Sequence, residues 1–162
     1  KIAEGEWAVF WLRIDNRLVH GQVVETWLPY LQSKYVIIVN DAVASDVLRQ
    51  QIIKLALPSR ITPHFTTIAN VQSVLASLKN AREDIFCLVE NCQDAQRIVE
   101  EGVGIETVNV GNIHYSSSCY QLSNSIAATS DDLSCFQFFE ERGISLDFRC
   151  VPSDKGEVKK IW

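Results

Sequence analysis

Arg13-Ile14-Asp15-Asn16-Arg17-Leu18-Val19-His20-Gly21-Gln22 is the stretch around which the rest of this chain can be interpreted. Residues 7–12, Trp-Ala-Val-Phe-Trp-Leu, precede it as an apolar run that predicts a buried strand. Residues 23–28 follow with apolar side chains at helical spacing. Two guanidinium groups and one imidazole are therefore expected in a strand-to-helix turn, where open α/β folds bind anions.

The residue types in this turn suit phosphoryl chemistry. A neutral imidazole such as that of His20 has a lone pair that can attack phosphorus. Arg13 and Arg17 can neutralise phosphoryl oxygens with planar, bidentate hydrogen bonds. The alternatives are a capping or packed histidine and a solvated rim of ion pairs, each worth only about 0–1 kcal/mol. Because a well-placed arginine can contribute ~10³–10⁵ in rate, we expect at least one catalytic arginine, and Arg17 more than Arg13.

Outside this turn, strand and helix patterns alternate along the chain. Apolar or β-branched runs predict strands at residues 35–40, 61–66, 85–89, 107–110 and 145–151, with a short one at 125–128. Helical spacing and capping residues predict helices at residues 47–56, 71–78, 92–101 and 131–141. This order predicts an α/β fold, a single doubly wound domain over residues 1–162 with a mainly parallel central sheet flanked by helices.

Composition excludes several classes of protein. A net charge of −5 argues against non-specific nucleic-acid binding. The sequence has no apolar run of about 20 residues and no signal-peptide pattern, so we expect a cytoplasmic protein that does not span a membrane. The five cysteines contain no Cys-x-x-Cys, and the three histidines lack zinc-ligand spacing, which indicates reduced structural thiols and no metal site.

The ten residues from Arg13 to Gln22 also carry a family resemblance. They resemble the active-site loop of the IIB component of the mannose/fructose/sorbose family of the bacterial sugar phosphotransferase system. Residues 39–44, 108–112 and 142–144 are similar to the same family in the same order.

The resemblance implies a protein-N(pi)-phosphohistidine–sugar phosphotransferase. In that family a histidine, here His20, accepts a phosphoryl group from a histidine of the IIA partner. It passes the group to a sugar held by the membrane components IIC and IID. No metal ion or organic cofactor is implied. The sugar, the phosphorylated ring nitrogen and a possible homodimer stay open.

Four other residues of the turn are candidates for supporting roles in binding or orientation. Asp15 is expected to orient an arginine or a loop N–H rather than to act as a base. Asn16 replaces the acid usual in the family and keeps its hydrogen bonding without its charge. Gln22 and the Gly21 N–H either help to cradle the phosphate or simply begin the helix.

Two further strand ends contribute candidates. Asp41 either caps the following helix or faces the active loop. Gly111 and His114 follow another strand and could line the same crevice. For His114, a position in a surface loop is the simpler interpretation. His64, within a short strand, is expected to be structural.

One segment departs from the family pattern. Related IIB components usually carry a glycine and a basic residue where this chain has Ser118, Cys119 and Tyr120, and there is no Lys or Arg between Arg97 and Arg142. We therefore expect acceptance from IIA to persist while onward transfer to a sugar transporter is weakened. The rival functions are a regulatory phosphohistidine protein and a non-catalytic anion- or nucleotide-binding module. The sequence has neither glycine-rich nucleotide motif that such a module would favour.

Overall fold

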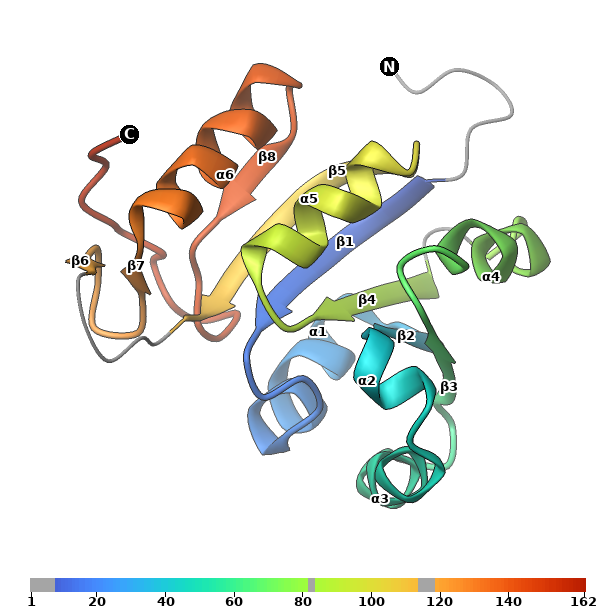
Figure 1. Ribbon diagram of the computed structural model, residues 1–162. Coiled ribbons are helices and arrows are strands. Elements are labelled where there is room, and N and C mark those ends of the chain that lie inside the picture. The colour runs from blue at the N-terminus through green and yellow to red at the C-terminus, as the bar shows by residue number, and fades with distance from the viewer. Residues whose placement is uncertain (1–7, 82–83, 114–118) are drawn as a thin grey trace.

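The computed structural model describes residues 8–81, 84–113 and 119–162, and the side chains from Trp11 onward within them. Six parallel strands form one central sheet in the order β3-β2-β4-β1-β5-β8 (Figure 1). Helices pack on both sides of the sheet. The doubly wound α/β class predicted from the sequence is confirmed.

The strands differ in burial according to their place in the sheet. The inner strands are β1 (Ala8–Asp15), β2 (Tyr35–Val39), β4 (Ile85–Val89) and β5 (Gly104–Asn112). Their sequences are nearly continuous apolar runs because both faces are covered. The edge strands β3 (Thr62–Thr66) and β8 (Ser145–Asp147) are shorter or more polar.

Two buried apolar clusters lie on opposite faces of the sheet. The first joins Leu12 and its face of the strands to α4 (Val71–Ser77), α5 (Cys92–Glu100) and α6 (Ser130–Glu141). The second joins Trp11 and the other face to the π-helical turn η1 (Val23–Trp27), α1 (Leu28–Leu31), α2 (Asp41–Ala44) and α3 (Val47–Ala56). Among the described residues, this second cluster includes no side chain of β5 or β8.

Several predicted helix ends are confirmed. Asn91 caps α5 by accepting a hydrogen bond from the Asp94 N–H at 2.7 Å, and Gly102 ends that helix with φ of 87°. Gly143, with φ of 70°, follows α6. A left-handed residue after a helix is favourable for glycine because it lacks a Cβ.

Other boundaries differ from the prediction. β1 continues through Asp15 and β5 through Asn112, because each pairs with the other to its end. β8 stops at Asp147, whose side chain turns back to accept from the Arg149 N–H at 3.0 Å. The predicted short strand is part of an antiparallel pair, β6 (Tyr120–Gln121) and β7 (Ala127–Ala128).

α3 forms where predicted but turns most of its apolar residues outward. Val47, Leu48, Ile52 and Leu55 have between 59% and 88% of their surface exposed, and Ile53 is the buried residue of the helix. At the chain end, Trp162 packs against Phe136 and Phe148, whereas Ile161 is exposed. No helix within the described residues is both long enough and apolar enough to cross a membrane.

Candidate functional site

The core of the site belongs to a strand rather than to a turn. Arg13 and Asp15 are residues of β1, and both side chains are completely buried. The sequence placed them in the strand-to-helix turn, which was wrong because pairing with β5 extends β1. Since both residues occupy alternate positions of one strand, their side chains point to the same face of the sheet.

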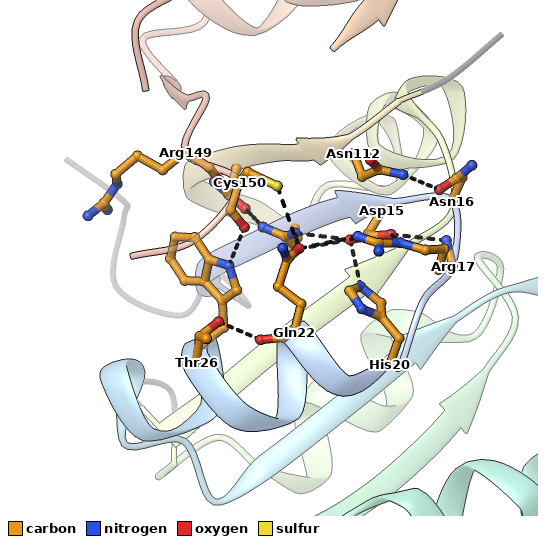
Figure 2. A network of polar contacts seen from close by, with 12 residues as sticks. Asp15, Asn16, Arg17, His20, Gln22, Thr26, Asn112, Arg149 and Cys150 are labelled. Atoms are coloured by element: carbon orange, nitrogen blue, oxygen red, sulfur yellow. Dashed lines mark hydrogen bonds and ion pairs between the residues drawn. The ribbon is translucent and has the colours of Figure 1, made fainter. Parts of the chain in front are cut away.

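Asp15 is the hub of the polar network (Figure 2). Its Oδ2 accepts from Arg13 Nη2 at 3.0 Å and from Arg17 Nη2 at 3.2 Å, and lies 2.8 Å from His20 Nε2. Its Oδ1 accepts from the Arg17 N–H at 3.0 Å and from Arg17 Nε at 3.1 Å. These contacts place the Asp15 carboxylate against both arginines, the His20 ring and a loop N–H.

The environment keeps Asp15 ionised. Burial alone would raise the pKa of Asp15, but hydrogen bonds from His20 and Arg17 and the charge of Arg13 outweigh it. The pKa therefore lies well below its usual range. Burial also lowers the pKa of the Arg13 guanidinium, an effect that the charge of Asp15 opposes. Arginine nevertheless stays protonated in proteins, so the site contains a buried ion pair.

The loop after β1 is fixed at both of its sides. Leu18 adopts a left-handed backbone with φ of 56°, its N–H donates to Asp15 O at 3.0 Å, and its side chain is buried in the second apolar cluster. Asn16 accepts from Asn112 Nδ2 at 2.6 Å, so β5 holds the other side. A left-handed leucine is costly and persists only when its surroundings determine it.

His20 stands where the loop enters a helix. Its side chain has 16% of its surface exposed, and its Nε2 faces the Asp15 carboxylate. An ionised carboxylate only accepts hydrogen bonds, so we assign the proton to Nε2. The helix that follows contains the π-helical turn η1, in which Thr26 donates its hydroxyl to Gln22 O. Such π turns are frequent at functional sites.

The two arginines differ in access. Arg17 has 43% of its side chain exposed, whereas Arg13 is sealed from solvent. Gln22 links them, because its Oε1 accepts from Arg13 Nη2 at 3.3 Å and from Arg17 Nη2 at 3.2 Å. Gln22 is therefore part of the polar network and not only a helix-starting residue.

Arg13 is enclosed by residues of β5 and η1. Its Nη1 donates to Asn109 Oδ1 at 2.6 Å, and its guanidinium lies 5.3 Å from the centre of the Trp27 ring. A Cβ added to Gly111 would lie 2.0 Å from Arg13 Cζ. Gly111 therefore lies against the site, and the Arg13 guanidinium occupies the space that a side chain at position 111 would need.

The remaining candidates have mixed outcomes. Asn40, not Asp41, caps α2 by accepting from the Val43 N–H at 3.0 Å. Asp41 instead accepts from the Ile68 N–H at 3.0 Å, so it ties down the segment after β3. Gly21 has no neighbouring atom within 4 Å of an added Cβ. His114 lies outside the described residues, as does Ser118.

Sequence reasoning missed five residues around the site: Trp27, Asn109, Asp147, Arg149 and Cys150. A signal existed for one of them. Asn109 lies between the buried Val108 and Val110, two residues before Gly111, and a buried amide between two such residues needs polar partners. The others depend on how the chain turns after β8.

Comparison with known proteins identifies the family. Residues 9–161 match the family described as "PTS system sorbose subfamily IIB component". The chain belongs to this family. An N-acetylgalactosamine-specific phosphotransferase enzyme IIB component 1 from Escherichia coli K12 is 32% identical to this IIB component over 90% of this chain and 92% of its own length.

Other relatives carry different sugar names. The fructose-specific EIIB component of Bacillus subtilis is 30% identical over 90% of this chain and 89% of its own length. The mannose-specific EIIAB component of Escherichia coli is 34% identical over 88% of this chain. This IIB component spans only 44% of that relative's length.

Solved structures agree with the fold. The N-acetylgalactosamine-specific IIB component 1 from Escherichia coli has a TM-score of 0.85 at 30% identity, over 94% of this chain and 99% of that one. The IIB domain of the sorbose permease from Klebsiella pneumoniae has a TM-score of 0.80 at 29% identity, over 91% and 90%.

Proposed function

We propose that this IIB component is a cytoplasmic phosphocarrier for sugar uptake, with His20 as the residue that becomes phosphorylated. The donor is a phosphohistidine on a IIA domain. The acceptor is a hydroxyl group of a sugar held by the membrane components IIC and IID. The observation that carries the assignment is the contact of His20 Nε2 with the buried, ionised Asp15 at 2.8 Å.

This contact selects the reacting nitrogen. With its Nε2–H hydrogen-bonded to the Asp15 carboxylate, the neutral imidazole keeps its lone pair on Nδ1. In the first step Nδ1 attacks phosphorus, a P–N bond forms, and the P–N bond to the IIA histidine breaks with its electrons returning to that nitrogen. In the second step the sugar oxygen attacks phosphorus, the P–N bond to His20 breaks with its electrons returning to Nδ1, and the hydroxyl proton passes to water.

Arg17 is the arginine suited to the phosphoryl group. Its guanidinium is partly exposed and reaches the Asp15 carboxylate beside His20. Arg13 directs Nε and Nη2 to Asp15, Nη2 also to Gln22, and Nη1 to Asn109. Since its donors are engaged and it is buried, we assign Arg13 to holding Asp15, and Arg17 to stabilising the transferring charge.

Phosphate labelling tests the assignment. The protein is incubated with a phosphorylated IIA domain, and the label is mapped. One acid-labile phosphoryl group per chain is expected on His20, and His20→Ala is expected to remain unlabelled while keeping its fold. Label on His64 or His114, or label persisting in His20→Ala, would exclude the proposal.

Onward transfer is a separate proposal. The lack of a basic residue at Cys119 and Tyr120 leads us to expect acceptance from IIA but slower sugar phosphorylation than in a relative that has one. A reconstituted assay with matched IIC and IID membranes measures this. Introducing Lys at either position is expected to raise the rate, and an unchanged rate would show that the departure has no effect.

A further inference from the structure

A row of three polar residues crosses the sheet beside the site. Arg13 on β1 is paired with Asn109 on β5, and Asn109 is paired with Asp147 on β8. Paired residues of neighbouring strands point to the same face, so these three side chains are neighbours. Arg13 and Asn109 are completely buried.

The contacts of Asn109 fix the direction of its amide. Its Nδ2 donates to three oxygens: Asp147 Oδ1 at 2.9 Å, Asp147 O at 3.2 Å and Arg149 O at 3.0 Å. A flipped amide would place its oxygen against these three acceptors. The carbonyl Oδ1 must therefore face Arg13 Nη1, at 2.6 Å.

The far end of the row is itself anchored. Asp147 accepts from Arg149 Nε at 2.9 Å and Nη2 at 2.8 Å. The Arg149 guanidinium lies 5.4 Å from the ring centres of both Trp27 and Tyr30. Trp27 in turn donates its Nε1–H to Cys150 O at 2.9 Å, so η1 and the turn after β8 hold each other (Figure 2).

Loss of the Asn109 carbonyl would leave Arg13 Nη1 buried without an acceptor. An unpaired buried donor is costly, and the guanidinium can lower that cost by rotating away from Asp15. Asp15 contacts both His20 Nε2 and Arg17, so this rotation would move both of the groups that the proposed function assigns to the phosphoryl group.

We propose that Asn109 is a positioning residue for phosphoryl transfer. It acts through Arg13 and Asp15 and is held by Asp147 and Arg149. This inference rests on the proposed function of His20.

The test measures how fast His20 is phosphorylated by phosphoramidate, a small P–N donor that needs no docking surface. Asn109→Ala is expected to lower the rate per folded molecule by about 100-fold, because small misplacements of catalytic groups cost about that much. The final stoichiometry on His20 is expected to stay at one. Asp147→Asn keeps both backbone oxygens and one side-chain oxygen as acceptors for the Asn109 amide and removes only the charge that pairs with Arg149, so a smaller decrease is expected.

Asn109→Asp tests the positioning role through the pH dependence of the rate, which would not change if Asn109 had a purely structural role. The introduced carboxyl faces Arg13 on β1 and Asp147 on β8, with Arg149 beyond and Asp15 further along β1. Ionised, it repels Asp147 and competes with Asp15 for Arg13. Protonated, it has the donor and acceptor of the amide. Burial and the three oxygens around it raise the pKa of the introduced carboxyl above its ordinary value of about 4, an effect that Arg13 opposes, so the ratio of variant to wild-type rate is expected to rise as the pH is lowered from 8 to 5.

Controls separate the two proposals. Phe139→Leu, in the apolar cluster on the opposite face, is expected to lower stability and to leave the rate unchanged. A wild-type rate in folded Asn109→Ala, or a pH-independent ratio in Asn109→Asp, would overturn the positioning role while label on His20 still supports the phosphocarrier. Label retained in His20→Ala would instead overturn the proposed function itself.

Discussion

One row of the sheet has two contrasting halves that meet between strands β4 and β1. From one edge to the other, the paired residues are Phe65, Ile38, Leu88, Arg13, Asn109 and Asp147. The first three are apolar and the last three are polar. Both halves have the same parallel strand pairing. The side chains alone therefore decide that one half belongs to the apolar core and that the other half holds the polar residues beside the candidate site.

The coverings of the two halves differ accordingly. Helical residues such as Val23, Val43 and Ile53 pack on the apolar half. The polar half lies against the turn after β8, through the backbone oxygens of Asp147 and Arg149. An apolar row needs only area to bury, whereas a polar row needs a partner for each donor and acceptor. The side chains of the polar half can therefore change their orientation less than those of the apolar half without losing stabilising contacts.

The largest effect on stability is expected from Asp15→Asn. This change leaves Arg13 buried without a charge partner, and we expect the free energy of unfolding to fall by about 4 kcal/mol. Urea denaturation at pH 7 measures it. A loss below about 1 kcal/mol would mean that Arg13 finds another partner and that the polar half is adaptable.

The same variant gives a pH test. Because the pKa of Asp15 is lowered in the folded state, its stabilising contribution is present above the unfolded pKa of about 4 and is lost as the pH falls below it. Wild type is expected to lose more stability than Asp15→Asn between pH 5 and pH 3. Parallel curves would contradict the ion-pair description.

Leu88→Ala tests the apolar half at the position next to Arg13. The cavity is expected to lower the free energy of unfolding by about 3 kcal/mol, while the rate of His20 phosphorylation per folded molecule stays within a factor of two of wild type. Chemical denaturation and labelling measure the two quantities. A slow but folded variant would show that both halves position the site.

Gly111→Ala tests how tightly the polar half is packed. The added Cβ would meet the Arg13 guanidinium, which its buried hydrogen bonds prevent from moving freely, so we expect a loss of about 2 kcal/mol. Gly21→Ala, where nothing lies within 4 Å of the added Cβ, is a control for stability. Equal melting temperatures for the two variants would contradict the close packing of Arg13.

Arg17→Lys should have the smallest effect on stability, within about 0.5 kcal/mol, because the side chain is partly exposed. Phosphorylation is expected to slow without stopping, since lysine keeps the charge but loses the planar fork. Rapid-quench labelling measures the rate. A wild-type rate in Arg17→Lys would show that Arg17 has no role in transfer and only forms solvent-exposed ion pairs.

The sequence predicted the parallel sheet and the turn that contains Arg17 and His20. Both depend on apolar periodicity and on residue spacing over short stretches, which determine local structure. It did not predict that Arg13 is sealed inside while Arg17 is exposed. That difference depends on Gly111 and Asn109, which are distant in sequence and become neighbours only through strand pairing. The roles of Asp147 and Arg149 depend on a turn in which a strand was expected.

The left-handed, buried Leu18 has a consequence for the timing of transfer. A loop that is anchored during folding needs no closing motion when a partner arrives, so little ordering entropy remains to be lost on binding. Closing of this loop should then not limit the exchange of phosphate, which leaves docking or the phosphoryl step as the slow event. A rate of transfer from a IIA domain that falls in proportion to solvent viscosity would indicate docking, and a rate independent of viscosity would indicate the phosphoryl step within the complex.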